Sequence, residues 1–180
     1  MKIKIRKAVW KDCANLAKVQ VDNYRLNYAG FLPQTYLQQF NYAEQEQDWK
    51  DWMITHPDDV LVIAETENEE MVGYALGKTG PTSIPPYDCE LTALHVSPNW
   101  QKSGIGRQLV REVASEFSKT GCASMMLWVI DKNPACLFYE RLGGQIIGQQ
   151  TIKPGTDDLH FIEIAYGWAD LKSLVETPSQ

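Results

Sequence analysis

The sequence lacks long hydrophobic runs. Nowhere in its 180 residues do about 18 consecutive apolar residues occur, the length that a membrane-spanning helix needs. The basic start, residues 2–7, is not followed by an apolar run of signal-peptide length. We therefore expect no membrane partner and no export. The length favours a single domain over 1–180, with about 169–180 as a C-terminal tail.

Positive charge is scarce. The chain has 17 Lys and Arg against 23 Asp and Glu, a net charge of -6 at pH 7. Binding nucleic acid through bulk electrostatics requires the opposite balance, so we expect no nucleic-acid partner. A cationic partner or substrate would be attracted. The 44% of hydrophobic and 22% of charged residues are typical of soluble globular proteins, so a packed core is expected.

Cysteine and histidine are few and dispersed. The four cysteines contain no C-x-x-C pair, which favours reduced thiols over a disulfide framework or a zinc site and predicts a cytoplasmic location. They are Cys13, Cys89, Cys122 and Cys136. The three histidines form no H-x-x-x-H motif and no cluster with carboxylates. We therefore predict no metal site.

Hydrophobic periodicity predicts an α+β fold, a single mixed β-sheet with helices on both faces. The expected strands are 2–6, 60–64, 71–76, 90–96, 125–130, 145–152 and 159–166. The expected helices run from an N-cap at Asp12 to about 27, as two short helices within 28–52, from 104 to 121, and from Asn133 to 143. The prolines of 80–87 indicate an exposed loop, and the last two strands form a hairpin that could pair across a homodimer.

The junction between the strand 90–96 and the next helix carries the sharpest chemical signal. A glycine-bearing turn that opens a helix presents backbone N–H groups at the positive end of the helix dipole, which favours a phosphate or pyrophosphate. Here the turn spans 101–107. It is not a Rossmann fingerprint, because Leu109 replaces the third glycine and no acidic ribose reader follows. It is not a P-loop either, because no G-K-[ST] triplet is present.

The wider arrangement resembles the GNAT superfamily of acyl-CoA-dependent N-acyltransferases. The matching residues are Leu94-His95-Val96, Gln101-x-x-Gly104-x-Gly106, and Asn133 followed by Tyr139 and Leu142-Gly143. The resemblance is strong over 89–148 and extends in element order over about 2–168. One departure is Gly144, where many members have Phe.

The resemblance implies a coenzyme site for acetyl-CoA as co-substrate. The implied coenzyme-binding residues are Leu94, His95, Val96, Gln101, Lys102, Ser103, Gly104, Ile105, Gly106, Arg107 and Asn133. Residues 101–107 would hold the pyrophosphate, and the backbone of Leu94 and Val96 would run beside the pantetheine arm. Asn133 and Tyr139 would lie near the thioester sulfur.

Acetyl transfer to an amine requires a base for the ammonium proton and an acid for the leaving thiolate. Tyr139 supplies a phenol for the acid. The candidate base is Glu90, where the family often places a carboxylate. His95 is the second candidate because its ordinary pKa is more suitable, about 6.5, although strand alternation directs it to the opposite face. A chain of water molecules is a third possibility.

The aromatic segment 28–52, with Tyr24 before it, corresponds in position to the part of the family that covers the acceptor. Tyr24, Tyr28 and Phe31, with Asp22 nearby, would suit a small cationic amine. We therefore predict an N-acetyltransferase that moves acetyl from acetyl-CoA to a primary amine by direct attack in a ternary complex. Alternatives are a non-catalytic acyl-CoA-binding sensor, acetylation of a protein N-terminus or lysine, and a nucleotide-binding domain.

Overall fold

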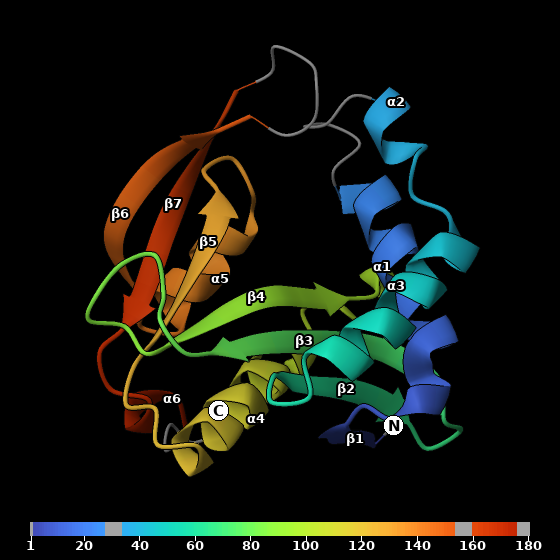
Figure 1. Ribbon diagram of the computed structural model, residues 1–180, viewed down its shortest axis with the longest axis horizontal. Coiled ribbons are helices and arrows are strands. Elements are labelled where there is room, and N and C mark those ends of the chain that lie inside the picture. Colours follow the sequence, from blue (N-terminus) through green and yellow to red (C-terminus); the bar gives the residue numbers. More distant parts are fainter. Residues whose placement is uncertain (1, 28–33, 154–159, 176–180) are drawn as a thin grey trace. The chain divides into compact units, whose positions relative to one another are not determined.

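The computed structural model describes residues 2–27, 34–153 and 160–175 (Figure 1). The strands among them are β1 (Ile3–Lys7), β2 (Val60–Thr66), β3 (Met71–Thr79), β4 (Cys89–Val96), β5 (Met125–Ile130), β6 (Gln145–Ile152) and β7 (Phe161–Trp168). The α-helices are α1 (Cys13–Asn27), α2 (Gln34–Leu37), α3 (Tyr42–Thr55), α4 (Ile105–Lys119), α5 (Ala135–Arg141) and α6 (Lys172–Val175). Two 3-10 helices, η1 (Trp10–Asp12) and η2 (Pro98–Trp100), complete the described elements.

The strands form one mixed sheet in the order β1-β2-β3-β4-β5-β7-β6. β1 runs antiparallel to β2, and β7 runs antiparallel to both β5 and β6. β4 is parallel to β5, because α4 returns the chain between them. The predicted α+β fold with a mixed sheet is confirmed.

Two compact units make up the chain. The first contains residues up to 76 together with 93–110, and the second contains 77–92 together with 111 onward. Each is described by itself below. None of the described helices has the length and apolar content needed to cross a bilayer.

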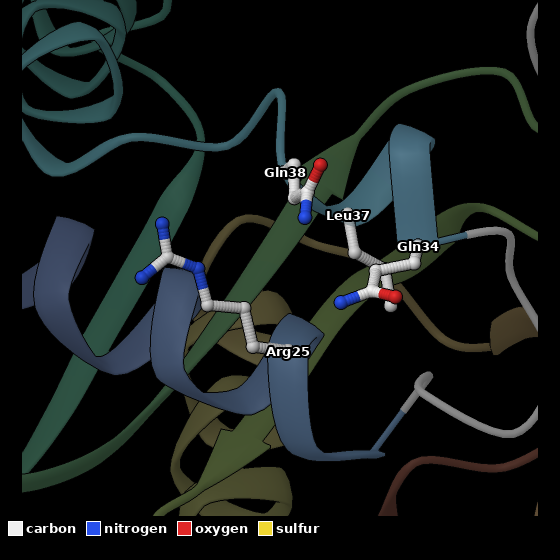
Figure 2. A pocket seen from close by; sticks show the side chains of 4 residues that line it. All are labelled: Arg25, Gln34, Leu37 and Gln38. Carbon is white, nitrogen blue, oxygen red and sulfur yellow. The ribbon is translucent and has the colours of Figure 1, made fainter.

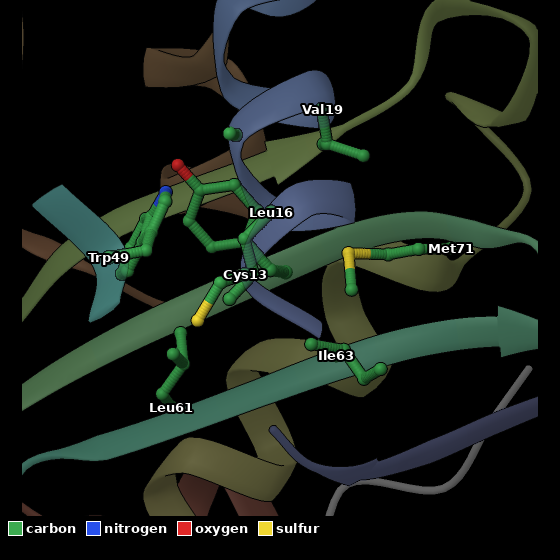
Figure 3. Close-up of a cluster of buried hydrophobic side chains, with 9 residues drawn as sticks. Cys13, Leu16, Val19, Trp49, Leu61, Ile63 and Met71 are labelled. Atoms are coloured by element: carbon green, nitrogen blue, oxygen red, sulfur yellow. The ribbon is translucent and has the colours of Figure 1, made fainter. Parts of the chain in front are cut away.

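The core of the first unit lies between two helices and two strands. α1 and α3 lie side by side against β2 and β3 (Figure 1). Figure 3 shows the buried cluster that joins them, which contains Leu16 from α1, Ile63 from β2 and Trp49 from α3. The Trp49 ring meets the Tyr74 ring of β3 edge-on, with centroids 5.3 Å apart. Aromatic burial of this kind dominates the energetics of a core, so it fixes α3 on the sheet.

The opposite face of β3 receives the start of α4. A Cβ atom added to Gly73 would lie 2.7 Å from the carbonyl oxygen of His95 and 3.3 Å from Cδ1 of Leu109. Glycine at this position therefore allows the backbones of β3 and β4 to approach closely. The amide of Ser97 continues this pairing by donating to the Val72 carbonyl over 2.9 Å. Gly73 thus supports the part of β4 that leads into the glycine turn.

The prediction of four reduced cysteines is wrong for two of them. In the second unit Cys89, at the start of β4, forms a disulfide with Cys122, after α4. Their Cα atoms are 6.5 Å apart, within the range that disulfides require. Local spacing could not predict this disulfide, because the two cysteines are 33 positions apart and the fold alone brings them together. Cys13 and Cys136 are free thiols, and the cytoplasmic location loses the support that reduced cysteines would have given it.

The N-cap predicted at Asp12 is also wrong. Asp12 lies in η1 and accepts hydrogen bonds from both terminal nitrogens of Arg6, at 2.7 and 3.0 Å, and from the Val9 amide at 2.8 Å. The same guanidinium donates to Glu65 over 2.7 Å. The Arg6 bonds hold the pKa of Asp12 below its usual value despite the cost of burial. Asp12 therefore ties β1 to the start of α1 as a buried ion pair.

Candidate functional site

The glycine turn between β4 and α4 lies in the first unit and is held by its own polar groups. Gln101 Nε2 donates to the Val96 carbonyl over 3.1 Å, and the Ser103 hydroxyl donates to the Trp100 carbonyl. Lys102 and Gly104 have φ values of 60° and 85°. These left-handed conformations turn the chain sharply before α4 begins.

The first amides of α4 have no carbonyl partner within the helix. The Gln108 amide is the first to bond back into the helix, to the Gly104 carbonyl at 3.1 Å. The amides that precede it are therefore not used by the helix, as at any helix N-terminus. Gln101, Lys102, Ser103 and Gly104 are exposed, and Gly106 and Arg107 are half-buried. Ile105 is 1% exposed and anchors the turn in the core. The turn can therefore accept an anion from solvent.

Strand β4 pairs with β5 at its start, within the second unit. Among the described residues, Cys89 lies opposite Met125 and Glu90 lies opposite Met126. Leu94 and Val96, whose backbone is predicted to run beside the pantetheine arm, belong to the part of β4 in the first unit.

His95 is buried against two tyrosine rings of the first unit. Its ring centroid is 5.7 Å from that of Tyr24 in α1 and 5.0 Å from that of Tyr74 in β3. Burial lowers the pKa of His95 to about 4. Because the neutral imidazole is such a weak base, His95 is poorly suited to take a proton from an ammonium group. Alternation along β4 directs it away from Leu94 and Val96, as predicted.

We expect His95 to make the protein unstable in mild acid. The unfolded chain binds the His95 proton near pH 6.5, whereas the folded protein resists it until about pH 4. The free energy of unfolding should therefore fall as pH drops from 6.5 to 4, by about 3 kcal/mol in total, and this contribution should not change further below pH 4. Urea unfolding at several pH values measures the fall.

The matched variant for this measurement is His95→Gln, which keeps a polar side chain that does not titrate. Carboxylates such as Asp12, whose pKa is lowered, also lose stability in acid, but they do so equally in both proteins. The wild-type and His95→Gln curves should therefore diverge between pH 6.5 and 4. If the two curves of unfolding free energy against pH stay parallel, the folded protein tolerates a protonated His95 and the expected pKa shift is wrong.

Glu90 lies on β4 in the second unit and is half-buried. Burial, and then the nearby charge of Glu163, raise the pKa of Glu90, while Lys78 opposes the shift. A carboxylate with a raised pKa is a stronger base than one in water, so Glu90 is suited to proton transfer.

Tyr139 lies on α5 in the second unit and is 8% exposed. Its ring packs against Phe138, Tyr166 and Trp168, with centroids 5.2, 6.1 and 6.3 Å away. These contacts fix the direction of the phenol. Asn133 precedes α5, and its Oδ1 accepts a hydrogen bond from the Ala135 amide at 2.9 Å. The helix that carries Tyr139 starts at Ala135 with Pro134 as its N-cap, so the N-cap predicted at Asn133 and the start predicted at Pro134 are each one residue early. The Asn133 side chain still bonds to the first helical amide.

Of the three predicted acceptor-binding residues, the structure describes only Tyr24. Tyr24 is half-buried, and its ring lies 4.7 Å from the Phe40 ring. Tyr28 and Phe31 lie outside the described residues. Asp22 accepts hydrogen bonds from Lys18 and from the Tyr42 hydroxyl, both at 2.7 Å. These two bonds engage both carboxylate oxygens, which weakens the case for Asp22 as the group that attracts a cationic amine.

Comparison with known proteins decides the family. Residues 24–144 match the model described as the acetyltransferase (GNAT) family. The chain belongs to the GNAT acetyltransferases. It is 29% identical over 172 residues to the uncharacterized N-acetyltransferase YuaI of Bacillus subtilis, a match that covers 96% of each chain. Over 79 residues it is 32% identical to the ribosomal protein bS18-alanine N-acetyltransferase of Escherichia coli, covering 43% of this chain and 50% of that one.

Solved structures agree on the GNAT fold. The PaiA N-acetyltransferase of Thermoplasma acidophilum, solved with coenzyme A, superposes with a TM-score of 0.71 at 22% identity and covers 91% of this chain and 98% of its own. The yncA protein of Salmonella typhimurium, solved with acetyl-CoA, gives 0.69 at 19% identity, covering 100% and 98%. This chain is therefore an acetyl-CoA-dependent N-acetyltransferase of the GNAT family.

The backbone groups of the turn between β4 and α4 suit the phosphates of the coenzyme, independently of the family comparison. The amides at the start of α4 that the helix does not use, after the exposed residues 101–104 and the left-handed Gly104, suit a pyrophosphate. The roles of Gln101 to Arg107, Leu94, Val96 and Asn133 in binding, and of Glu90 and Tyr139 in catalysis, stay predictions.

Sequence reasoning missed Arg25. This residue lines a pocket in the first unit with Gln34, Leu37 and Gln38 (Figure 2). The periodicity of α1 predicted a helix up to about 27 but gave no indication that its last turn faces α2. A basic residue beside the candidate acceptor residue Tyr24 was the only signal.

Proposed function

We propose that this enzyme transfers acetyl from acetyl-CoA to the primary amine of a small molecule by direct attack in a ternary complex. The observation that carries the proposal is the turn before α4, whose exposed residues 101–104 and left-handed Gly104 lead into helix amides that suit the coenzyme in a chain of this family. The net charge of -6 favours an acceptor whose amine is protonated in solution.

The free cysteines support direct attack over a covalent acyl-enzyme. Cys13 is buried, and burial raises its pKa. Burial is also the main cause that raises the pKa of Cys136, which is partly exposed. A nucleophilic cysteine requires the opposite shift, because the thiolate is the reactive form. In our proposal Glu90 therefore takes the ammonium proton, directly or through water, and Tyr139 donates a proton to the departing sulfur.

A screen of primary amines with acetyl-CoA, monitored by release of the free coenzyme thiol, tests the proposal. The panel should contain polyamines, amino acids and aminoglycosides. Acetylation of at least one of them, confirmed by mass spectrometry, is the expected result. If the protein binds acetyl-CoA but acetylates no amine, it is an acyl-CoA sensor and the proposal is wrong.

A peptide N-terminus is the second candidate acceptor. It is favoured by the similarity to the bS18-alanine N-acetyltransferase, which covers 43% of this chain. Peptides that begin with alanine therefore belong in the same panel. Turnover of a peptide at a rate well above that of every small amine would favour this candidate.

We expect Gly104→Ala to weaken coenzyme binding. Gly104 has a φ of 85°, which a residue with a Cβ adopts only under strain, and relief of that strain would turn the amides of α4 away from the pyrophosphate. Loss of one or two hydrogen bonds to a charged group predicts a Kd for CoA raised by roughly 10- to 100-fold. Calorimetric titration with CoA measures it.

Gly121→Ala is the matched control for Gly104→Ala. Gly121 follows α4, has a φ of 92°, and like Gly104 has open space where its Cβ would lie. Both variants should lose similar stability, but only Gly104→Ala should lose affinity. Equal affinities in the two variants would argue against coenzyme binding at the turn.

A further inference from the structure

A pocket between α1 and the α2 segment has the size of a small-molecule site. Its volume is about 460 Å³, and such sites usually measure roughly 300 to 1,000 Å³. The described residues that line it are Arg25 from α1 and Gln34, Leu37 and Gln38 from α2 and its end. Figure 2 shows these four side chains, with Arg25 on α1 and the two glutamines across from it.

The pocket is rich in hydrogen-bond donors. A guanidinium group carries only donors, and each glutamine amide adds a donor that can turn toward a ligand. Leu37 is 5% exposed and supplies an apolar wall. The pocket therefore carries one positive charge within a chain whose net charge is -6. This local reversal of sign favours an anionic group and disfavours a polyamine.

Contacts from other elements hold Arg25 in place. Arg25 Nη2 donates to the Phe40 carbonyl over 2.8 Å, and the guanidinium carbon lies 5.3 Å from the centre of the Tyr42 ring. Tyr42 is itself fixed, because its hydroxyl donates to Asp22 over 2.7 Å. The guanidinium is thus oriented by groups that leave several of its donors for a ligand.

Among the residues that the structure describes, no carboxylate is hydrogen-bonded to Arg25. The charge of Asp22 acts on Arg25 from a distance, but the Asp22 oxygens are bonded to Lys18 and to the Tyr42 hydroxyl. A guanidinium matches a carboxylate in charge and in planar geometry, because two parallel N–H groups can bond to its two oxygens.

The pocket is connected to the strand that is predicted to bind the coenzyme. Tyr24 precedes Arg25 on α1, and its ring contacts Phe40 and His95. His95 lies between Leu94 and Val96, whose backbone is predicted to run beside the pantetheine arm. All these residues belong to the first unit. Through Tyr24 and Phe40, the end of α1 that carries Arg25 is thus packed against β4.

We propose that Arg25, assisted by the amides of Gln34 and Gln38, binds a carboxylate on the acceptor. The preferred acceptors are then amino-acid-like molecules, which carry a primary amine and a carboxylate together. The proposal rests on the proposed acetylation of small amines and narrows it to this class. It is compatible with a protonated amine, because such acceptors are zwitterions in solution.

Matched pairs of acceptors test the proposal by kinetics. Each α-amino acid is compared with the amine that remains when its carboxylate is removed, and kcat/KM is measured for both. The acid should be preferred by about 10-fold or more, and Arg25→Gln should abolish most of this preference, mainly through KM. Arg25→Lys, which keeps the charge but not the paired donors, should give an intermediate loss. The control Lys172→Gln removes one exposed charge from α6 and should leave the preference unchanged.

A binding measurement decides the matter even if no panel amine is acetylated. N-acetyl amino acids and their carboxamides are titrated calorimetrically into the protein with CoA present. Tighter binding of the acids by about 10-fold, lost in Arg25→Gln, would support the carboxylate site even if the proposed acetylation fails. Equal binding of acids and carboxamides, or an equal effect of Arg25→Gln on both members of each kinetic pair, would overturn it.

Discussion

Replacing Tyr139 by Phe is expected to lower kcat by about 10²- to 10⁴-fold, the usual contribution of a positioned general acid. The substitution removes only the phenolic oxygen, and the ring contacts with Phe138, Tyr166 and Trp168 can persist. The KM for acetyl-CoA should change little, because the phenol acts on the leaving sulfur and not on the coenzyme phosphates. Steady-state kinetics with saturating acceptor separates the two parameters.

Tyr166→Phe is the matched control, since it removes a hydroxyl from a neighbouring ring. The Tyr166 hydroxyl donates to Glu140 over 2.9 Å, and its role in our account is structural. Tyr166→Phe should therefore reduce stability but keep kcat within a few-fold. A Tyr139→Phe enzyme with unchanged turnover would contradict the assignment of Tyr139 as the acid.

Glu90→Gln is expected to lower kcat/KM at neutral pH by a similar factor, about 10²- to 10⁴-fold. At pH 7 the acceptor amine is mostly protonated, so removal of its proton limits the reaction. The loss should shrink as the pH approaches the pKa of the amine, because the free amine needs no base. The rate measured from pH 6 to 10 checks this pattern, and a loss that is constant with pH would indicate a structural effect instead.

The pH dependence of the wild-type rate should also show whether Glu90 is the base. A base works only when it is deprotonated, and the pKa of Glu90 is raised, so the acid limb should lie above the ordinary value for glutamate. Glu163→Gln removes a charge that raises this pKa and should move the limb to lower pH. Lys78→Gln should move it to higher pH. An acid limb that stays in place in both variants would exclude Glu90 as the titrating group.

The sequence predicted the fold closely because most of its elements follow strong local rules. Alternation located β1, and the hairpin of β2 and β3 was bracketed by turn residues. The end of α4 was predicted from Gly121, whose φ is 92°. Asp12 failed as a predictor because its carboxylate is bound by Arg6 and Val9. An ion pair formed in the tertiary structure cannot be predicted from the local spacing of residues.

In the candidate site, too, the features with local sequence signatures were predicted, and the features that depend on tertiary contacts were not. The turn 101–107 was singled out because a glycine-bearing helix N-terminus has a local signature, and its predicted coenzyme role came from the resemblance to the GNAT superfamily. The low pKa of His95 could not be predicted, since it depends on burial beside Tyr24 and Tyr74. Arg25 was missed because a pocket between two helices depends on how their side chains meet. The Cys89–Cys122 bond was missed because it joins positions far apart in the chain.

That bond closes a covalent ring of backbone around the glycine turn, since residues 97–107 all lie between Cys89 and Cys122. A protease that cuts after the exposed Lys102 would open the ring without freeing either fragment. The nicked protein would migrate as one species on a denaturing gel until a reductant was added. The chain segments before and after the loop that is predicted to hold the coenzyme are thus joined by a disulfide in addition to the peptide backbone.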